Sequence, residues 1–140
     1  MAEKFKNYLK HITSTGTSEV IPYADETNTK EKREGNSTVQ VHSLYITRVD
    51  NDRFSGENRY KEASFNHVDI MIVENDDVAN ATYVGYDIQL VPGSSYFFEK
   101  NITLEPTQSL YINLPAGVGA NDTYHNIHVT ASAVLFIEDE

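Results

Sequence analysis

The chain has 140 residues, a formal net charge of −10 at neutral pH, and neither cysteine nor tryptophan. This length fits one domain, which we expect to span residues 1–140. The absence of cysteine excludes disulfides, thiolate zinc sites and cysteine nucleophiles. Because nucleic acids and anionic membranes are bound by basic surfaces, the acidic balance leads us to expect neither as a partner.

The chain begins with spaced apolar residues at Phe5, Tyr8, Leu9 and Ile12. Their spacing also fits one face of a short helix. A loop-forming run and β-branched residues follow, so we interpret residues 5–12 as a strand or arm, and residues 1–12 as a docking arm or edge strand. Residues 24–36 are polar and carry charges of both signs, which is typical of a solvated loop.

Alternation of apolar and polar residues predicts strands over much of the remaining chain. The first covers residues 38–48, where Leu44, Tyr45 and Ile46 are apolar in succession, as in an internal strand. A long polar connection at 49–63 comes next. Further strands are predicted at 66–74, 82–90, 94–98, 102–104, 109–114 and 126–137. Short strands separated by turns, without a long helical pattern, predict an all-β fold, an antiparallel β-sandwich or jelly roll.

Motifs for chemistry are lacking in the sequence. It contains neither a phosphate-binding P-loop nor a G-x-S-x-G nucleophile motif, so we expect a non-enzymatic protein without cofactors. His125 and His128 have a metal-ligand spacing for a helix, but on a strand they face opposite sides. Acidic turns at 50–52 and 74–77 offer oxygen ligands without the EF-hand pattern, which leaves calcium binding as an alternative to ordinary polar turns.

The candidate functional residues are therefore contact residues rather than catalytic, cofactor-binding or metal-binding ones. An apolar ring with a polar tip suits contacts with proteins and with sugars. Near the predicted loops and in the first segment, the candidates are Phe5, Tyr8, Leu9, Tyr60, Tyr83 and Tyr124. Lysines also crowd the first segment while acids end the chain, so these two regions of neighbouring copies have complementary charge.

The order of motifs resembles that of small structural proteins of tailed bacteriophages, including cyanophages. The resemblance rests on the stretch VDIMIVEND, on the Pro-Gly-Ser-Ser run that ends the next strand, and on the Ala-Ser-Ala of the last strand. The Thr-Gly-Thr-Ser run and the Val-Ile-Pro-Tyr that follows also look like the opening of these proteins. This chain departs from the pattern at 105–108, which replaces the usual Gly-Asp turn, and in the long polar loops 24–36 and 49–63.

The resemblance implies a β-sandwich with an architectural role in the virion, assembled in the host cytoplasm. Capsid decoration or a head-to-tail neck component is the expected place, with a tail position as a further option. The partners would be other virion proteins, and a homo-oligomer is expected. A carbohydrate-binding or receptor-binding module on the same kind of fold is the alternative, because the loops supply tyrosines and acids.

Overall fold

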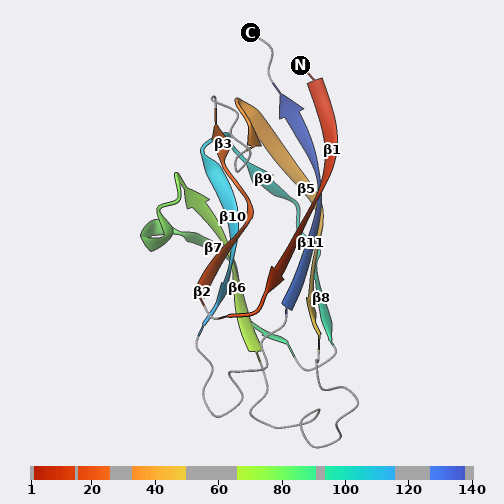
Figure 1. Cartoon of the computed structure of the whole chain (residues 1–140), viewed down its shortest axis with the longest axis vertical. Coiled ribbons are helices and arrows are strands. Elements are labelled where there is room, and N and C mark those ends of the chain that lie inside the picture. The colour runs from red at the N-terminus through yellow and green to blue at the C-terminus, as the bar shows by residue number, and fades with distance from the viewer. Residues whose placement is uncertain are drawn as a thin grey trace, which may run out of the picture.

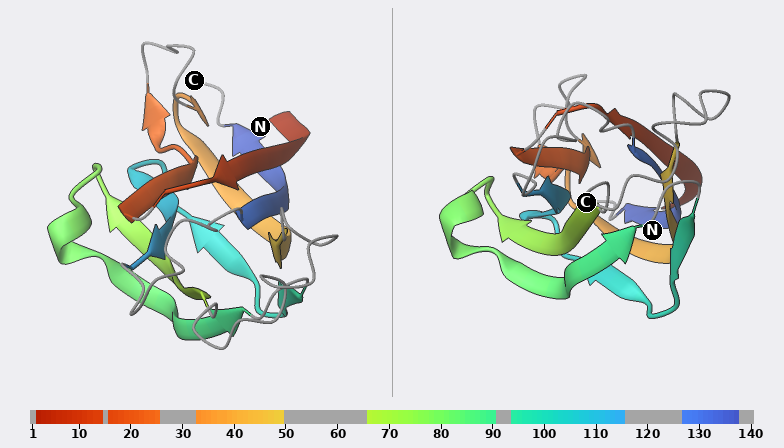
Figure 2. Two further views of the ribbon diagram at one scale, coloured as in Figure 1. Left: turned by 60° about the horizontal axis from the view of Figure 1, so that its bottom comes forward. Right: turned by 90° about the horizontal axis from the view of Figure 1, so that it is seen from below.

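The computed structural model describes residues 2–14, 16–25, 33–49, 66–90, 94–115 and 127–137. Most of these residues lie in strands, and the long strands form two antiparallel sheets that pack face to face (Figure 1). In the left-hand view of Figure 2, the green strands β6 and β7 lie on the opposite side of the molecule from red β1 and blue β11. The sequence-based prediction of an all-β sandwich is confirmed.

The first sheet has five strands. Its order is β1 (Ala2–Ile12), β11 (Ile127–Ile137), β5 (Ser37–Arg48) and β8 (Ser95–Phe98), while β9 (Ile102–Leu104) pairs with the earlier part of β5. The predicted internal strand is thus β5, which has β11 on one side and β8 and β9 on the other. Ala2 pairs with Ile137, so the beginning of β1 and the end of β11 lie side by side.

The second sheet has four strands. Its order is β2 (Gly16–Ile21), β10 (Gln108–Leu114), β6 (Asn66–Glu74) and β7 (Thr82–Leu90). A short 3-10 helix, η2 (Val78–Asn80), lies in the connection between β6 and β7. Because β6 and β7 follow one another along the chain, this half of the sheet is a hairpin.

The core is formed by apolar residues that alternate along the strands with outward-facing ones. In β11, the residues Val129, Ala131, Ala133 and Leu135 are buried between the sheets, whereas the residues that alternate with them face outward. The strands β6 and β10 contribute Ile70, Ile112 and their neighbours from the opposite sheet. Burial of these aliphatic side chains is the dominant favourable contribution to folding, at roughly 25 cal/mol per Å² of apolar surface.

Irregularities in the pairing redirect two side chains. Ser43 pairs with Ser132 but Val41 pairs with Ala133, so His42 is an extra residue in β5 and points outward in a β-bulge. In β7, Asp87 has a left-handed φ of 56°, and its N–H donates to a carboxylate oxygen of buried Asp69 at 2.8 Å. These bulges change the local direction of the strands without interrupting the core.

A buried arginine joins the connecting segments at one end of the sandwich. Arg33, in the two-residue strand β4 (Arg33–Glu34) that pairs with β3 (Ala24–Asp25), is only 1% exposed. Its guanidinium donates to the carbonyl oxygens of Pro22, Ser37, Glu105 and Gln108 and to the Ser37 hydroxyl, at 2.7–3.2 Å. The prediction of a solvated loop over 24–36 is therefore wrong at Arg33, because backbone carbonyls satisfy its donors in place of water.

Candidate binding face on the five-stranded sheet

The side of the five-stranded sheet that turns away from the core is the candidate site, and we call it the outer face. Cross-strand pairs have their side chains on the same side of a sheet, so the register identifies its members. They are Glu3, Phe5, Asn7, Leu9 and His11 of β1, His128, Thr130, Ser132, Val134 and Phe136 of β11, Thr38, Gln40, His42, Ser43, Tyr45 and Thr47 of β5, Ser95 and Phe97 of β8, and Thr103 of β9.

This face carries very little charge. Among its members in the described strands, Glu3 is the only aspartate, glutamate, lysine or arginine, although the whole chain has a net charge of −10. The other polar groups are hydroxyls, amides and imidazoles. These groups offer both hydrogen-bond donors and acceptors without attracting ions.

Aromatic and aliphatic side chains project from the same face. Tyr45 and Phe97 are directly opposite each other on β5 and β8, and their rings stack with centroids 4.7 Å apart. They remain 46% and 42% exposed, and Phe5 and Leu9 on β1 are 84% and 70% exposed. Four of the six large hydrophobic side chains that are exposed in the described part of the chain therefore belong to this face.

Polar contacts hold the side chains between these apolar groups. The Thr47 and Ser95 hydroxyls are 2.9 Å apart, and the Ser132 hydroxyl donates to the Asn7 side-chain oxygen at 2.8 Å. Next to the second pair is a shallow depression of about 310 Å³, a volume at the lower end of small-molecule sites. Its lining consists of Phe5, Lys6, Asn7, His42, Ser132 and Ala133.

Two histidines stack at one end of the face. His11 of β1 and His128 of β11 are directly paired, with ring centroids 3.8 Å apart and nearly parallel planes. Partial desolvation, followed by the neighbouring His11, lowers the pKa of His128 below its ordinary value of 6.5. The lowered pKa favours the neutral form of His128, which agrees with the low charge of the face.

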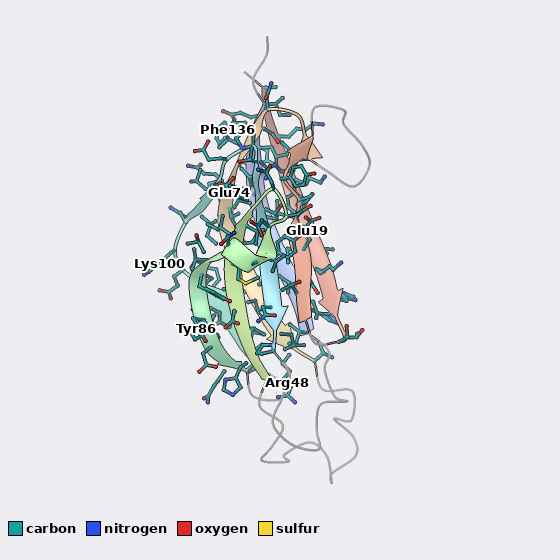
Figure 3. The ribbon with its side chains drawn as sticks, turned by 90° about the vertical axis from the view of Figure 1, so that its left-hand side faces the viewer. Glu19, Arg48, Glu74, Tyr86, Lys100 and Phe136 are labelled. Atoms are coloured by element: carbon teal, nitrogen blue, oxygen red, sulfur yellow. The ribbon has the colours of Figure 1, made fainter. Side chains whose placement is uncertain are left out.

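The opposite side of the molecule differs in charge. Figure 3 looks onto the four-stranded sheet, with Glu19 on one side of the view and Tyr86 and Lys100 on the other. On this sheet the Tyr111 hydroxyl donates to Asp76 at 2.8 Å and lies 3.2 Å from a Glu19 carboxylate oxygen. Burial and these two carboxylates raise the Tyr111 pKa well above its ordinary value. Acidic groups thus gather over the four-stranded sheet, away from the outer face.

A groove at the side of the sandwich is a second concave feature, of about 390 Å³. It lies between Val84 of β7 and the segment from Tyr96 to Lys100, so it joins the two sheets at their edges. Phe97 lines this groove as well as belonging to the outer face. The groove carries the charged residues Glu99 and Lys100, in contrast to the outer face.

The predicted contact residues are distributed unevenly over the molecule. Phe5 and Leu9 lie on the outer face, whereas Tyr8 turns inward and is 8% exposed. Tyr83 is half exposed on β7, where its ring meets that of Tyr86 edge to face at 5.1 Å. Tyr60 and Tyr124, like His125 and the acidic turn 50–52, lie outside the described residues.

Sequence reasoning missed Tyr45, Phe97 and the His11–His128 pair. Alternation predicts strands at Tyr45 and Phe97, but it does not show which outward-facing rings become neighbours. In the acidic turn 74–77, the Glu74 carboxylate accepts hydrogen bonds from Thr107 and Gln108, which lower its pKa.

Within the described part of the chain, no cluster of three or more metal-ligating side chains occurs. No helix in this part has the length and apolar character to span a membrane.

The similarity found between this chain and known proteins is structural and distant. No protein-family model and no curated protein matches it. Among solved structures, the CBM22-1 xylan-binding domain of Xyn10C from Paenibacillus barcinonensis aligns over 99% of this chain and 98% of its own, with 10% identity and a TM-score of 0.41. At this level of similarity, the neighbour's ligand is not transferred to this chain.

The geometry of the outer face itself therefore decides what the site can do. The face is broad, largely uncharged and built on regular strands, and it combines ring surfaces with short hydroxyl and amide side chains. Such a surface suits a neutral ligand that has both apolar patches and hydroxyl groups.

Proposed function

We propose that this protein is a non-catalytic binding module that holds a neutral carbohydrate on the outer face of its five-stranded sheet. The observation that carries the proposal is the stacked, half-exposed Tyr45–Phe97 pair on a face where Glu3 is the only charged strand residue.

Charge favours a neutral ligand over a charged one. An anionic ligand would be repelled by a chain with net charge −10, and a cationic ligand would be attracted to the acidic groups above the four-stranded sheet instead. A neutral polysaccharide is neither repelled by the net charge of the chain nor attracted to the acidic groups. Its hydroxyls match the donors and acceptors of Thr47, Ser95 and Asn7.

The aromatic pair favours a ligand with flat apolar surfaces. A pyranose ring exposes C–H groups on its faces, and aromatic rings bind such surfaces while keeping a polar tip in water. Because Tyr45 and Phe97 stack on each other, sugar units contact their remaining faces and edges. The row from Phe97 and Tyr45 to Thr130 and Leu9 crosses four strands, which provides space for several units along one line.

Binding measurements with matched variants test the proposal. We expect one or more neutral polysaccharides to retard the protein in affinity electrophoresis, and Tyr45→Ala and Phe97→Ala each to weaken binding by roughly tenfold, which equals about 1.4 kcal/mol. Tyr86→Ala is the matched control, because it removes an exposed ring from β7 in the other sheet.

Two results would refute the proposal. One is a panel of neutral polysaccharides that shows no binding with or without calcium. The other is a loss of binding in Tyr86→Ala equal to that in Tyr45→Ala, which would place the ligand elsewhere. Circular dichroism melting of every variant separates lost binding from lost folding.

A structural role in a tailed-phage virion is the second candidate. The observation that favours it is the exposure of Phe5 and Leu9 on the terminal strand of a sheet, since apolar side chains at such a position suit contacts between subunits. Antibody labelling of purified particles tests it, and the copy number distinguishes decoration from a neck ring. Particles without this protein would eliminate the virion role.

A further inference from the structure

The strand β1 has an edge that none of the other described strands pairs with. In the order of the five-stranded sheet, β1 is terminal and its partner is β11 along its whole length, from Ala2 to Ile12 (Figure 1). A terminal strand presents a row of backbone N–H and C=O groups that can pair with a further strand. At 11 residues, β1 is long for an edge strand, since natural edges are commonly kept short.

The side chains on the outward side of β1 are arranged symmetrically about Asn7. Two residues before it is Phe5 and two residues after it is Leu9, which are 84% and 70% exposed. Four residues before it is Glu3, whose carboxylate accepts hydrogen bonds, and four after it is His11, whose imidazole can donate one. A strand with this arrangement is complementary to an antiparallel copy of itself.

We propose that β1 pairs antiparallel with β1 of a second copy, about a two-fold axis that passes beside Asn7. In this register, Phe5 lies opposite Leu9 of the second copy and Glu3 opposite His11 of the second copy, and each contact occurs twice. Directly opposite apolar residues stabilise an antiparallel pair by roughly 0.2–1 kcal/mol each. The Glu3 carboxylate can accept a hydrogen bond from the His11 imidazole of the second copy. The two five-stranded sheets then become one continuous sheet.

Other registers lose these contacts. A shift by two residues places Asn7 opposite Phe5 or Leu9, and Glu3 then lies opposite Leu9 or has no partner in the strand. A shift by one residue places the outward side chains of one copy on the same side as the core-facing ones of the other. The Asn7-centred register is therefore the one in which the apolar contacts and the Glu3–His11 pairs coincide.

The lysines of β1 determine how tightly we expect the two copies to associate. Edge lysines commonly oppose strand pairing, and here Lys4 faces Lys10 of the second copy on the other side of the strand. Lys6, in contrast, faces Tyr8 of the second copy, and its ammonium group already lies 5.0 Å from the centre of its own chain's Tyr8 ring. We therefore expect a concentration-dependent dimer rather than an obligate one.

The dimer has a consequence for the outer face. Pairing across β1 joins two outer faces into one surface of low charge, and two linked sites raise the apparent affinity for a long polymer without any new contact. The dimer itself is independent of the proposed ligand. Self-association and carbohydrate binding can each fail without the other.

Cross-linking at Asn7 tests the register directly, because the chain contains no other cysteine. In Asn7→Cys, the two thiols lie opposite each other, with Cβ atoms about 4.5–5.5 Å apart, and a short bis-maleimide should join the copies rapidly. Phe5→Cys alone should react slowly, since its two copies are about 14 Å apart along the strand, whereas Phe5→Cys mixed with Leu9→Cys should cross-link. Tyr86→Cys is the control for random collision.

Sedimentation gives the second readout. The wild-type chain should shift from monomer to dimer with rising concentration, and the double variant Phe5→Lys with Leu9→Lys should remain monomeric while keeping its melting temperature, because both side chains are exposed. A wild-type chain that stays monomeric at every concentration overturns the proposal. So does a dimer in which Asn7→Cys cross-links no faster than Tyr86→Cys.

Discussion

Arg33 shows how a single residue fixes the connections of this sandwich. Its guanidinium donates to four backbone carbonyl oxygens and one hydroxyl, from segments that are up to 75 positions away in the sequence. Burial lowers the pKa of Arg33 to about 10, which still leaves it protonated at neutral pH. Among the described residues, the charge is therefore stabilised by backbone carbonyl dipoles.

Replacement of Arg33 should strongly destabilise the fold. Arg33→Met removes the donor to one buried and three partly buried carbonyl oxygens, and an unsatisfied buried group costs about 1–3 kcal/mol. We therefore expect the free energy of unfolding to fall by about 3 kcal/mol or more. Arg33→Lys should also be destabilised, because an ammonium group lacks the fork geometry. Lys100→Met, which removes an exposed cation, is the control. Urea unfolding measures all three, and a change below about 1 kcal/mol in Arg33→Met would contradict this account.

At the scale of elements, the pairing of β1 with β11 couples the sandwich to pH. His11 and His128 stack across these strands, and the pKa of His128 is lowered in the folded protein. When the pH falls through the ordinary histidine pKa near 6.5, the unfolded chain binds a proton at this position before the folded chain does. The contribution of His128 to stability is thus full above that pH and decreases as the pH falls.

The variant His128→Gln isolates this contribution. Between about pH 8 and about pH 5, the free energy of unfolding should decrease less in His128→Gln than in the wild-type chain. His42→Gln removes another outward-facing histidine of the same face and should keep the wild-type dependence. Denaturant unfolding at both pH values is the measurement, and equal pH dependence in wild type and His128→Gln would show that the stacked pair makes no such contribution.

The sequence predicts the positions of the strands better than it predicts which strands pair with each other. The β6 and β11 regions alternate clearly, and both are strands with the expected core-facing residues. In β1, the spacing of Phe5, Tyr8, Leu9 and Ile12 also fits a helix, but the structure places Phe5 and Leu9 outward and Tyr8 and Ile12 inward. Alternation thus indicates the correct faces once the strand is known.

The remaining features depend on contacts between distant segments. The Tyr45–Phe97 stack requires that β5 and β8 pair in one particular register, which no local pattern of residues specifies. The burial of Arg33 depends on carbonyl groups near residues 22, 37 and 105–108, so its polar surroundings in sequence suggest a solvated loop. Neither feature was accessible from the residue types alone.

At the scale of the whole molecule, the described carboxylates are distributed unevenly between the two sheets. Carboxylates gather over the four-stranded sheet, at Glu19, Asp69 and Asp76, whereas the outer face of the five-stranded sheet has Glu3 alone among its strand residues. Among the described residues, acidic side chains are therefore more frequent on one side of the molecule than on the other. This division is the reason for placing a neutral ligand on the outer face.

Chemical-shift mapping during titration with a neutral polysaccharide identified by the binding screen tests this placement most directly. Amide signals of β5, β8 and β11 around Tyr45, Thr47, Phe97 and Thr130 should shift together and saturate with the ligand, while those of Glu19, Asp69 and Val84 should not move. Shifts concentrated at Val84 and Lys100 would place the ligand in the lateral groove, and shifts around Glu19 and Tyr111 would place it on the acidic sheet. Either result would contradict binding on the outer face.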